Sequence, residues 1–315
     1  MTTKPSELGP PRWRGQPHRL EVWYATLTDP RTTDGYWLHH EVVAPDEGAA
    51  YAHGWCAVFP FDGPARVERF GPAAPDPGGD AWFSAAGAYV DGEALRGAAG
   101  DLTWDLTYAD TSPPLYTFPS WSWEKEVLPA SQIVPFPTAR FTGTVSVGGR
   151  DVRVDDAIGA VARIYGHGNA ERWGWLHADL GGGDVLEVVA GAPRKRGPVA
   201  IPPVPLVQLR LDGDDWPADS VKAAARARAK IALPHWSVKV VSGRRRLLVD
   251  VTVPADASVA LRYTDPDGAI ATCTNSERAD AEIVLQQWDD GWRDDRRWSL
   301  RGTAHAEVGT RSSGS

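Results

Sequence analysis

Most of the chain alternates between apolar and polar residues with a period of two. The run RLEVWYATL places Leu20, Val22 and Tyr24 on one side and Glu21 and Trp23 on the other. The same alternation recurs in residues 35–43, 53–61 and 102–110. Successive side chains of a strand point to opposite faces, so these segments predict strands that are buried on one face.

Turn residues separate these runs at regular intervals. Gly148-Gly149, Gly181 to Asp184 and Ser242-Gly243 each join two apolar runs and predict β-hairpins. One window, Ala218 to Leu233, is rich in alanine and long side chains and is closed by Pro234, which predicts a short helix. Many strands with frequent turns indicate an all-β protein of sandwich or barrel type.

Two segments do not fit the strand pattern. Residues 1–17 are rich in proline, glycine and charge, which predicts a flexible tail. Residues 113–138 are rich in proline and too irregular for a strand ladder. This segment is either a surface connection or an aromatic flap over a barrel mouth. Its aromatic residues are Tyr116, Phe118, Trp121, Trp123 and Phe136.

The charge balance argues against polyanionic partners. The formal net charge of the 315 residues is −8, whereas nucleic acid and anionic lipid both attract a basic face. The basic runs Arg194–Arg196 and Arg244–Arg246 stand beside turn residues and are expected to be solvated loop charges. We therefore expect no nucleic-acid partner.

The chain shows no sign of membrane insertion or export. No run approaches the roughly 20 apolar residues that a spanning helix needs, so we expect no integral membrane segment. The N-terminal residues contain no apolar core of a signal peptide, which favours the cytoplasm. Cys56 and Cys273 are then expected to be reduced thiols in the core rather than a disulfide.

Aromatic residues and a few ionisable groups form the candidate chemistry. The chain has 15 tryptophans, whose rings can line an apolar pocket or stabilise a cation. Strand alternation places Trp173, Trp175, His177 and Asp179 on one face. Such a face is either an apolar slot with a proton donor or acceptor, or a set of buried polar groups satisfied by hydrogen bonds.

A second face of the same kind combines Trp37, His39 and Glu41, and the two alternatives stay open for it as well. His53 can converge on this pair across strands, in which case a metal site is a further alternative. The chain lacks the P-loop, G-x-S-x-G, H-E-x-x-H and C-x-x-C motifs. GHGNAE begins like a dinucleotide-binding loop, but Glu171 occupies the third glycine position and no βαβ unit surrounds it.

Three stretches together resemble a known superfamily. They are LEVWYATLTDPRTTDGYWLHHEVVAP, RIYGHGNAERWGWLHADLGGGDVLEV, and the closing pair YTDPDGAIATCTNSERADAEIVL and GTAHAEVGTR. They are similar to the hydroxyneurosporene synthase (carotenoid hydratase), AttH-like and tocopherol cyclase-like proteins, a group that includes decalin-forming Diels–Alderases. The matched positions are Glu21, Trp23, Tyr24, Gly166, Arg172, Trp173 and Trp175. Arg163 stands where relatives often have histidine.

The resemblance implies two lipocalin-like β-barrel domains, at residues 18–168 and 169–315, with a ligand cavity inside or between them. It also implies a hydrophobic small-molecule substrate, such as a polyene or prenylated compound, and no cofactor. We therefore expect a cyclase, hydratase or isomerase, or a pericyclic catalyst of the Diels–Alderase kind. The alternative is a non-catalytic carrier or sensor of a hydrophobic metabolite, which the same fold serves equally well.

The candidate residues follow from these faces and motifs. The acid–base candidates are His39, Glu41, His177 and Asp179. The candidates for substrate binding are Trp23, Tyr24, Trp37, Trp104, Trp121, Trp123, Tyr165, Trp173 and Trp175. No metal or cofactor ligands are assigned, and the oligomeric state is left open.

Overall fold

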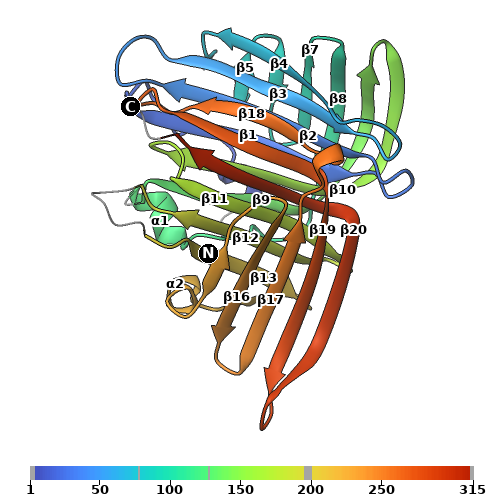
Figure 1. Cartoon of the computed structure of the whole chain (residues 1–315). Coiled ribbons are helices and arrows are strands. Elements are labelled where there is room, and N and C mark those ends of the chain that lie inside the picture. The colour runs from blue at the N-terminus through green and yellow to red at the C-terminus, as the bar shows by residue number, and fades with distance from the viewer. Residues whose placement is uncertain (1–3, 77–78, 127, 195–200, 313–315) are drawn as a thin grey trace. The chain divides into compact units, whose positions relative to one another are not determined.

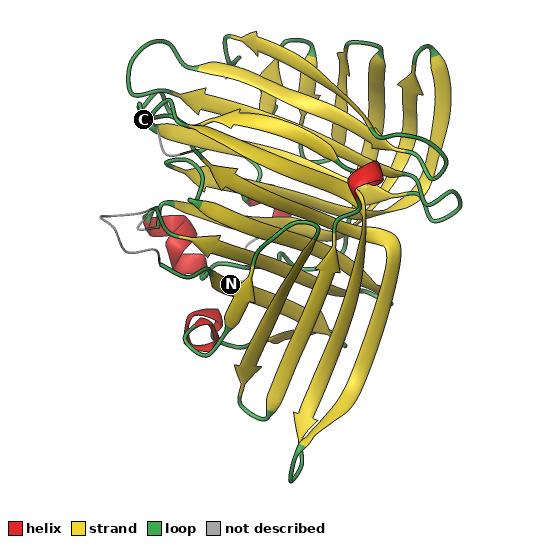
Figure 2. Ribbon diagram, viewed as in Figure 1, coloured by secondary structure: helices red, strands yellow, loops and turns green. Residues whose placement is uncertain are grey.

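The structure is a computed structural model that describes residues 4–76, 79–126, 128–194 and 201–312. Nearly all regular structure in these residues is β-strand, and the two α-helices are short (Figures 1 and 2). The predicted all-β fold class is therefore confirmed. No helix among the described residues is long and apolar enough to cross a membrane.

The chain divides into two compact units, each built on one sheet whose neighbouring strands run antiparallel. The first unit comprises Met1–Tyr116, Ser120–Gly168 and the turn Thr264–Ala269. The second unit comprises Thr117–Pro119, Asn169–Tyr263 and Ile270–Ser315. A short piece of late sequence thus belongs to the first unit, and it brings Asp265 to that unit's polar residues.

The sheet of the first unit has ten strands in the order β4-β3-β2-β1-β10-β9-β8-β7-β6-β5. The unit also holds the 3-10 turn η1 (Pro5–Glu7) and the helix α1 (Ser120–Lys125). The strands are β1 (Arg19–Thr28), β2 (Gly35–Ala44), β3 (Tyr51–Phe59), β4 (Arg66–Ala73), β5 (Phe83–Ala85), β6 (Ala88–Val90), β7 (Ala94–Ala99), β8 (Leu102–Ala109), β9 (Ala130–Val147) and β10 (Arg150–Gly166).

One face of this sheet carries the hydrophobic core, which includes Trp23, Leu38, Leu106 and Phe141. Strand β8 alternates strictly between buried and exposed residues, as predicted. Strands β1 and β2 are buried on both faces instead, so the predicted exposure of their second face is wrong. The second face of these strands bears aromatic and ionisable side chains that are themselves buried.

The sheet of the second unit follows the order β14-β13-β12-β11-β20-β19-β17-β16-β15, with β18 paired to β19. The unit also contains the helix α2 (Ser220–Ala224) and the 3-10 turn η2 (Ala255–Ala257). The strands are β11 (Arg172–Gly181), β12 (Asp184–Ala192), β13 (Val204–Leu211), β14 (Asp214–Trp216), β15 (Arg228–Lys230), β16 (His235–Ser242), β17 (Arg245–Thr252), β18 (Val259–Thr264), β19 (Ile270–Trp288) and β20 (Trp292–Arg311).

The core of the second unit gathers Leu176, Val188, Trp236, Leu247 and Ile283 on one face of its sheet. Leu176 alternates with Trp175 and His177 along β11, so these two residues point to the opposite face. His177 therefore lies on the side of the sheet away from the core.

The three predicted hairpins are confirmed. Gly148 and Gly149 join β9 to β10 with φ of +59° and +79°, a left-handed backbone that glycine adopts without strain. The turn after Gly181 joins β11 to β12, and the turn after Ser242 joins β16 to β17. The basic run Arg244–Arg246 lies at this last turn. Lys195 and Arg196 of the other basic run fall outside the described residues.

The predicted helix at Ala218–Leu233 is present but much shorter, since α2 covers only Ser220–Ala224. The Asp219 carboxylate accepts the Lys222 N–H and caps its first turn. Further along, Arg228–Lys230 forms β15 and pairs with β16. Cross-strand pairing therefore overrides the helix propensity of this alanine-rich segment.

The segment 113–138 is more regular than predicted. Helix α1 occupies part of it, and β9 already begins at Ala130, so the absence of a strand there is wrong. Pro135 and Pro137 are tolerated because the register between β9 and β10 shifts around Phe136. Phe136 itself packs in the first core. Both sequence alternatives, a surface connection and a flap, miss this strand.

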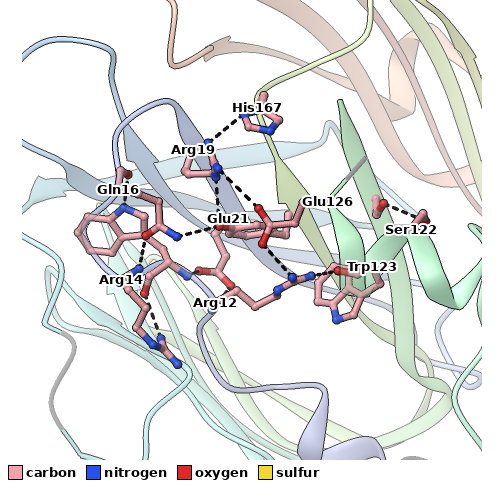
Figure 3. Close-up of polar contacts among 12 residues, drawn as sticks. Arg12, Arg14, Gln16, Arg19, Glu21, Ser122, Trp123, Glu126 and His167 are labelled. Atoms are coloured by element: carbon pink, nitrogen blue, oxygen red, sulfur yellow. Dashed lines mark hydrogen bonds and ion pairs between the residues drawn. The ribbon is translucent and has the colours of Figure 1, made fainter. Parts of the chain in front are cut away.

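The described part of the N-terminal segment is packed rather than flexible. Leu8 is buried in a small cluster with Trp123, Ile133 and Tyr165. The buried Glu21 carboxylate accepts the backbone N–H of Arg12 at 2.7 Å and that of Trp13 at 2.9 Å. These bonds hold the segment against the end of β1 (Figure 3).

Two further side chains, one on β1 and one on β10, complete this attachment, and both lie on the core face. Arg163 pairs with Glu21 and donates to the Pro10 carbonyl at 2.9 Å. Trp23 donates its indole N–H to the Gly9 carbonyl at 2.8 Å. Buried charges and donors of this kind must be satisfied, and the backbone of the N-terminal segment supplies the partners.

Gly9 provides a test of this attachment. An added Cβ would lie 1.9 Å from the Trp82 ring, which is too large and too rigid to yield cheaply. We expect Gly9→Ala to lower the free energy of unfolding by about 1–3 kcal/mol, measured by chemical denaturation. Gly191→Ala is the control, since its Cβ would only reach Ala170 at 3.7 Å. Equal stability of the two variants would contradict the packed arrangement.

Candidate functional site

The first unit carries five buried aromatic and ionisable residues on the sheet face opposite its core. We call this set the Glu41 face. It consists of Trp37, His39 and Glu41 from β2 and His53 and Trp55 from β3. Alternation along β2 places its three members on one side, and Glu41 pairs across the strands with His53. The predicted convergence of His53 is therefore confirmed.

Glu41 is the centre of this face. Its Oε2 atom lies 3.2 Å from His39 Nε2, at hydrogen-bond distance, and 3.7 Å from His53 Nε2. Its Oε1 atom has no hydrogen-bond partner among the described residues. One carboxylate oxygen is thus shared by two imidazoles, and the other is left for a further partner.

Indole rings flank the imidazoles on both strands. The centroid of Trp37 lies 4.9 Å from that of His39, and the centroid of Trp55 lies 4.9 Å from that of His53. The two indoles are stacked with centroids 6.4 Å apart. Tyr24 on β1 is the cross-strand neighbour of His39. The surroundings of Glu41 are therefore apolar and rich in π electrons.

Burial sets the protonation of the Glu41 face. Loss of hydration raises the pKa of Glu41 to about 7, and the nearby Asp265 carboxylate adds to this rise against the opposing effect of His53. Burial also lowers the pKa of His39 to about 3 and that of His53 to about 4. At neutral pH both imidazoles are uncharged and Glu41 is close to half protonated, which suits a proton donor.

The second unit carries a comparable set, which we call the His177 face. Trp173, Trp175 and His177 come from β11, Glu187 from β12, and His305 and Glu307 from β20. Glu187 Oε2 lies 2.9 Å from His177 Nδ1, and its Oε1 accepts the Trp175 indole N–H at 2.6 Å. Trp173 donates its indole N–H to Glu307 in the same way.

Further ionisable groups extend this face onto the neighbouring strands. The His305 ring stacks on that of His177 with centroids 5.7 Å apart, and its Nδ1 lies 3.6 Å from the Glu277 carboxylate. Burial raises the pKa of Glu277 well above its ordinary value and lowers that of His305 well below it. Burial therefore favours the uncharged forms of both Glu277 and His305.

Of the four predicted acid–base residues, His39 and Glu41 lie together on the Glu41 face of the first unit. His177 lies on the His177 face of the second unit. Asp179 does not join them, because its carboxylate accepts the Gly181 N–H and caps the hairpin turn. Four residues of this face are not among those predicted from the sequence: Glu187, His305, Glu277 and Glu307. Each follows the two-residue alternation of its own strand, but nothing in the sequence shows which strands pair.

The predicted substrate-binding residues separate into three groups. Tyr24, Trp37, Trp173 and Trp175 lie on the two polar–aromatic faces. Trp23 and Trp104 pack in the first core, on the sheet face opposite to Trp37. The remaining residues lie away from both faces: Trp121 is 44% exposed, and Trp123 and Tyr165 contact each other beside the N-terminal segment.

The described residues contain no cluster of histidine, cysteine and carboxylate groups able to hold a metal ion. The two cysteines, Cys56 and Cys273, are free thiols buried in the two units, as predicted. Open surface hollows of about 420 and 270 Å³ lie beside β5–β6 and on β15–β17, and neither includes a residue of the two faces. The candidate chemistry therefore rests on the buried faces themselves.

Comparison with known proteins assigns the chain to a family. Residues 83–310 match the tocopherol cyclase-like family. The chain belongs to this family. Two uncharacterized Mycobacterium tuberculosis proteins, from strains CDC 1551 and H37Rv, are each 50% identical over 302 residues. The alignment covers 96% of this chain and 89% of each relative. The predicted resemblance is confirmed at this level, whereas the narrower assignment to hydroxyneurosporene synthase stays a prediction.

Solved structures of other proteins share the fold. A Nitrosomonas europaea protein of AttH type superimposes with a TM-score of 0.57 at 15% identity, over 93% of this chain and 92% of its own. Kievitone hydratase from Nectria haematococca gives a TM-score of 0.60 at 11% identity, over 99% and 97% of the two chains. The TM-scores show a shared fold, and at identities this low they show the fold alone.

The raised pKa of Glu41 makes a prediction about stability. The folded protein keeps the Glu41 proton up to about pH 7, whereas the unfolded chain releases it near 4.5. This difference stabilises the folded state by about 3 kcal/mol below pH 4.5. The stabilisation is lost as the pH rises from 4.5 to 7. Glu41→Gln removes this dependence. We expect the difference in unfolding free energy between wild type and Glu41→Gln to fall by that amount between pH 4.5 and 7.5.

The comparison cancels the contributions of other titrating groups, which both proteins share. Denaturant unfolding at four pH values measures the difference, and Glu47→Gln in an exposed loop is the matched control. A difference that does not change with pH would show that Glu41 ionises in its ordinary range.

Proposed function

We propose that this protein is a hydratase or cyclase that protonates a carbon–carbon double bond of an apolar small molecule, with Glu41 as the acid. The observation that carries the proposal is the Glu41 carboxyl itself. Its pKa is raised to about 7 by burial, its Oε1 atom has no partner among the described residues, and indole rings flank the imidazoles that contact it. An acid poised near the working pH is the group that such a reaction requires.

The proposed reaction begins with transfer of the Glu41 proton to one alkene carbon, which leaves a carbocation on the other. In a hydratase, the oxygen of water then forms a bond to that carbon and loses a proton. In a cyclase, a hydroxyl oxygen of the same substrate does so. The released proton returns to Glu41 through His39 or His53, so the carboxyl is restored and no redox step is needed.

Trp37 and Trp55 supply the second requirement of this chemistry, which is a stabilised cation. The face of an indole attracts positive charge, an effect of about 2 kcal/mol or more where water is excluded. Neutral imidazoles are compatible with this role, since protonated histidines beside the cation would repel it. A polyene or a prenylated compound fits such surroundings because its reacting part is entirely apolar.

Family membership supports the proposal without fixing the substrate. The family is named for a cyclase, and one protein of the same fold is a hydratase. A hydratase adds water across an unsaturated bond, and a cyclase closes a ring. Proton transfer to a carbon–carbon double bond can begin either reaction.

Solvent deuterium tests the proposal directly. We would incubate the protein with prenylated quinols and with polyenes in D₂O and analyse products by mass spectrometry. Because the Glu41 proton exchanges with solvent, the product should carry one deuterium on carbon. Glu41→Gln lacks the acid, so the rate should fall roughly 10²- to 10⁴-fold, while Glu47→Gln should react like wild type.

Three outcomes would reject this assignment. Turnover that is unaffected by Glu41→Gln would exclude Glu41 as the acid. A product without carbon-bound deuterium would indicate a pericyclic reaction, in which the shape of the site suffices. Stoichiometric retention of an unchanged ligand would identify a carrier.

A further inference from the structure

A row of polar side chains crosses five neighbouring strands of the second unit. Gln208 pairs with Glu187, Glu187 with His177, and His177 with His305, from β13 through β12 and β11 to β20. Glu277 on β19 continues the row next to His305. All five side chains are buried. Burying five polar groups in one row lowers the stability of the fold unless their hydrogen bonds are satisfied.

Glu187 fixes the orientation and the tautomer of His177. The Trp175 indole N–H can only donate, so Glu187 Oε1 accepts it at 2.6 Å. The other oxygen, Oε2, lies 2.9 Å from His177 Nδ1. A carboxylate only accepts hydrogen bonds, so Nδ1 carries the imidazole proton. The lone pair of the neutral ring is then on Nε2.

The Nε2 atom of His177 is buried and has no hydrogen-bond partner among the described residues. His177 itself is 1% exposed. Every other contact of the ring serves to hold it: Glu187 binds Nδ1 and His305 stacks on its face. A buried acceptor held in place from two sides and left without a donor is suited to a ligand that brings one.

Glu187 is the group placed to stabilise a positive charge on His177. Its Oε2 atom lies 2.9 Å from His177 Nδ1, as in other acid–base pairs of histidine and carboxylate. Burial lowers the pKa of the neighbouring His305 well below its ordinary value and raises that of Glu277 well above it, so burial favours the uncharged forms of both groups.

We propose that His177 Nε2 binds the hydroxyl group of an apolar ligand and accepts its proton, with Glu187 as the positioning residue. The O–H bond breaks, its electron pair stays on oxygen, and the proton forms an N–H bond on Nε2. Trp173, Trp175 and the adjacent Val189 supply apolar contact for the rest of the molecule. This inference rests on the proposed function for the apolar class of ligand alone, and it adds that the ligand held at this site of the second unit bears a hydroxyl group.

The tautomer is the first test. In full-length protein labelled with ¹⁵N-histidine, the ring-nitrogen shifts at pH 8 should show His177 protonated on Nδ1 and bare on Nε2. The His177→Asn variant assigns the signals. In Glu187→Gln the side chain keeps one oxygen that accepts and gains an amide group that donates. His177 should then no longer carry its proton preferentially on Nδ1. Asp179→Asn, which alters only the turn at Gly181, should leave it unchanged.

The second test uses a matched pair of probes, 1-naphthol and 1-methoxynaphthalene. The two are similar in apolar surface, but only the naphthol can donate to Nε2. We expect wild type to bind 1-naphthol at least about tenfold more tightly by equilibrium dialysis and to shift the His177 Nε2 signal. His177→Phe keeps an aromatic ring without the acceptor, and it should abolish the preference while its circular dichroism matches that of wild type.

The results separate this proposal from the role of Glu41. The Glu41→Gln variant should keep both the tautomer and the naphthol preference, so failure of the acid assignment leaves the hydroxyl site standing. A wild-type His177 protonated on Nε2, or equal affinity for the two probes, would overturn the hydroxyl site and leave the deuterium experiment on Glu41 unaffected.

Discussion

Both units depend on the two-residue alternation of paired strands, which sends neighbouring side chains to opposite faces of the sheet. The consecutive residues His39 and His40 show its effect. His39 contacts Glu41, whereas His40 lies in the hydrophobic core against Phe70 and Phe83. A slip of one residue in register would exchange the two sets of side chains, so core and chemistry are specified by the same pairing.

Once the register places ionisable groups in a dry environment, desolvation decides their charge. Burial disfavours every ion, so the pKa values of His39 and His53 fall and that of Glu41 rises. The result is a set of neutral groups with one proton available near pH 7. Glu21 and Arg163 instead form a buried ion pair. Their remaining hydrogen-bond partners come from the backbone of the N-terminal segment.

The sequence predicts the features that local patterning controls. The alternating strands, the glycine hairpins and the convergence of His39, Glu41 and His53 all follow from period two and from turn chemistry. Features that depend on pairing between distant segments are not predictable in this way. Arg228–Lys230 is a strand because β16 offers it an edge, and Glu187 belongs to the site because β12 pairs with β11. The N-terminal segment is ordered because Glu21, Trp23 and Arg163, on strands far from it in the sequence or at its end, bind its backbone.

The two motifs that indicate the family have different roles in this structure. In the first motif, Glu21 and Trp23 bind the N-terminal segment, so they build the scaffold and take no part in the polar–aromatic faces. In the second motif, Trp173 and Trp175 lie on the His177 face, and Trp175 holds Glu187 in position for His177. His39 and Glu41, which carry the proposed acid chemistry, lie within the first stretch but are not among its matched positions. A family signature therefore indicates this fold more directly than it indicates the reacting groups.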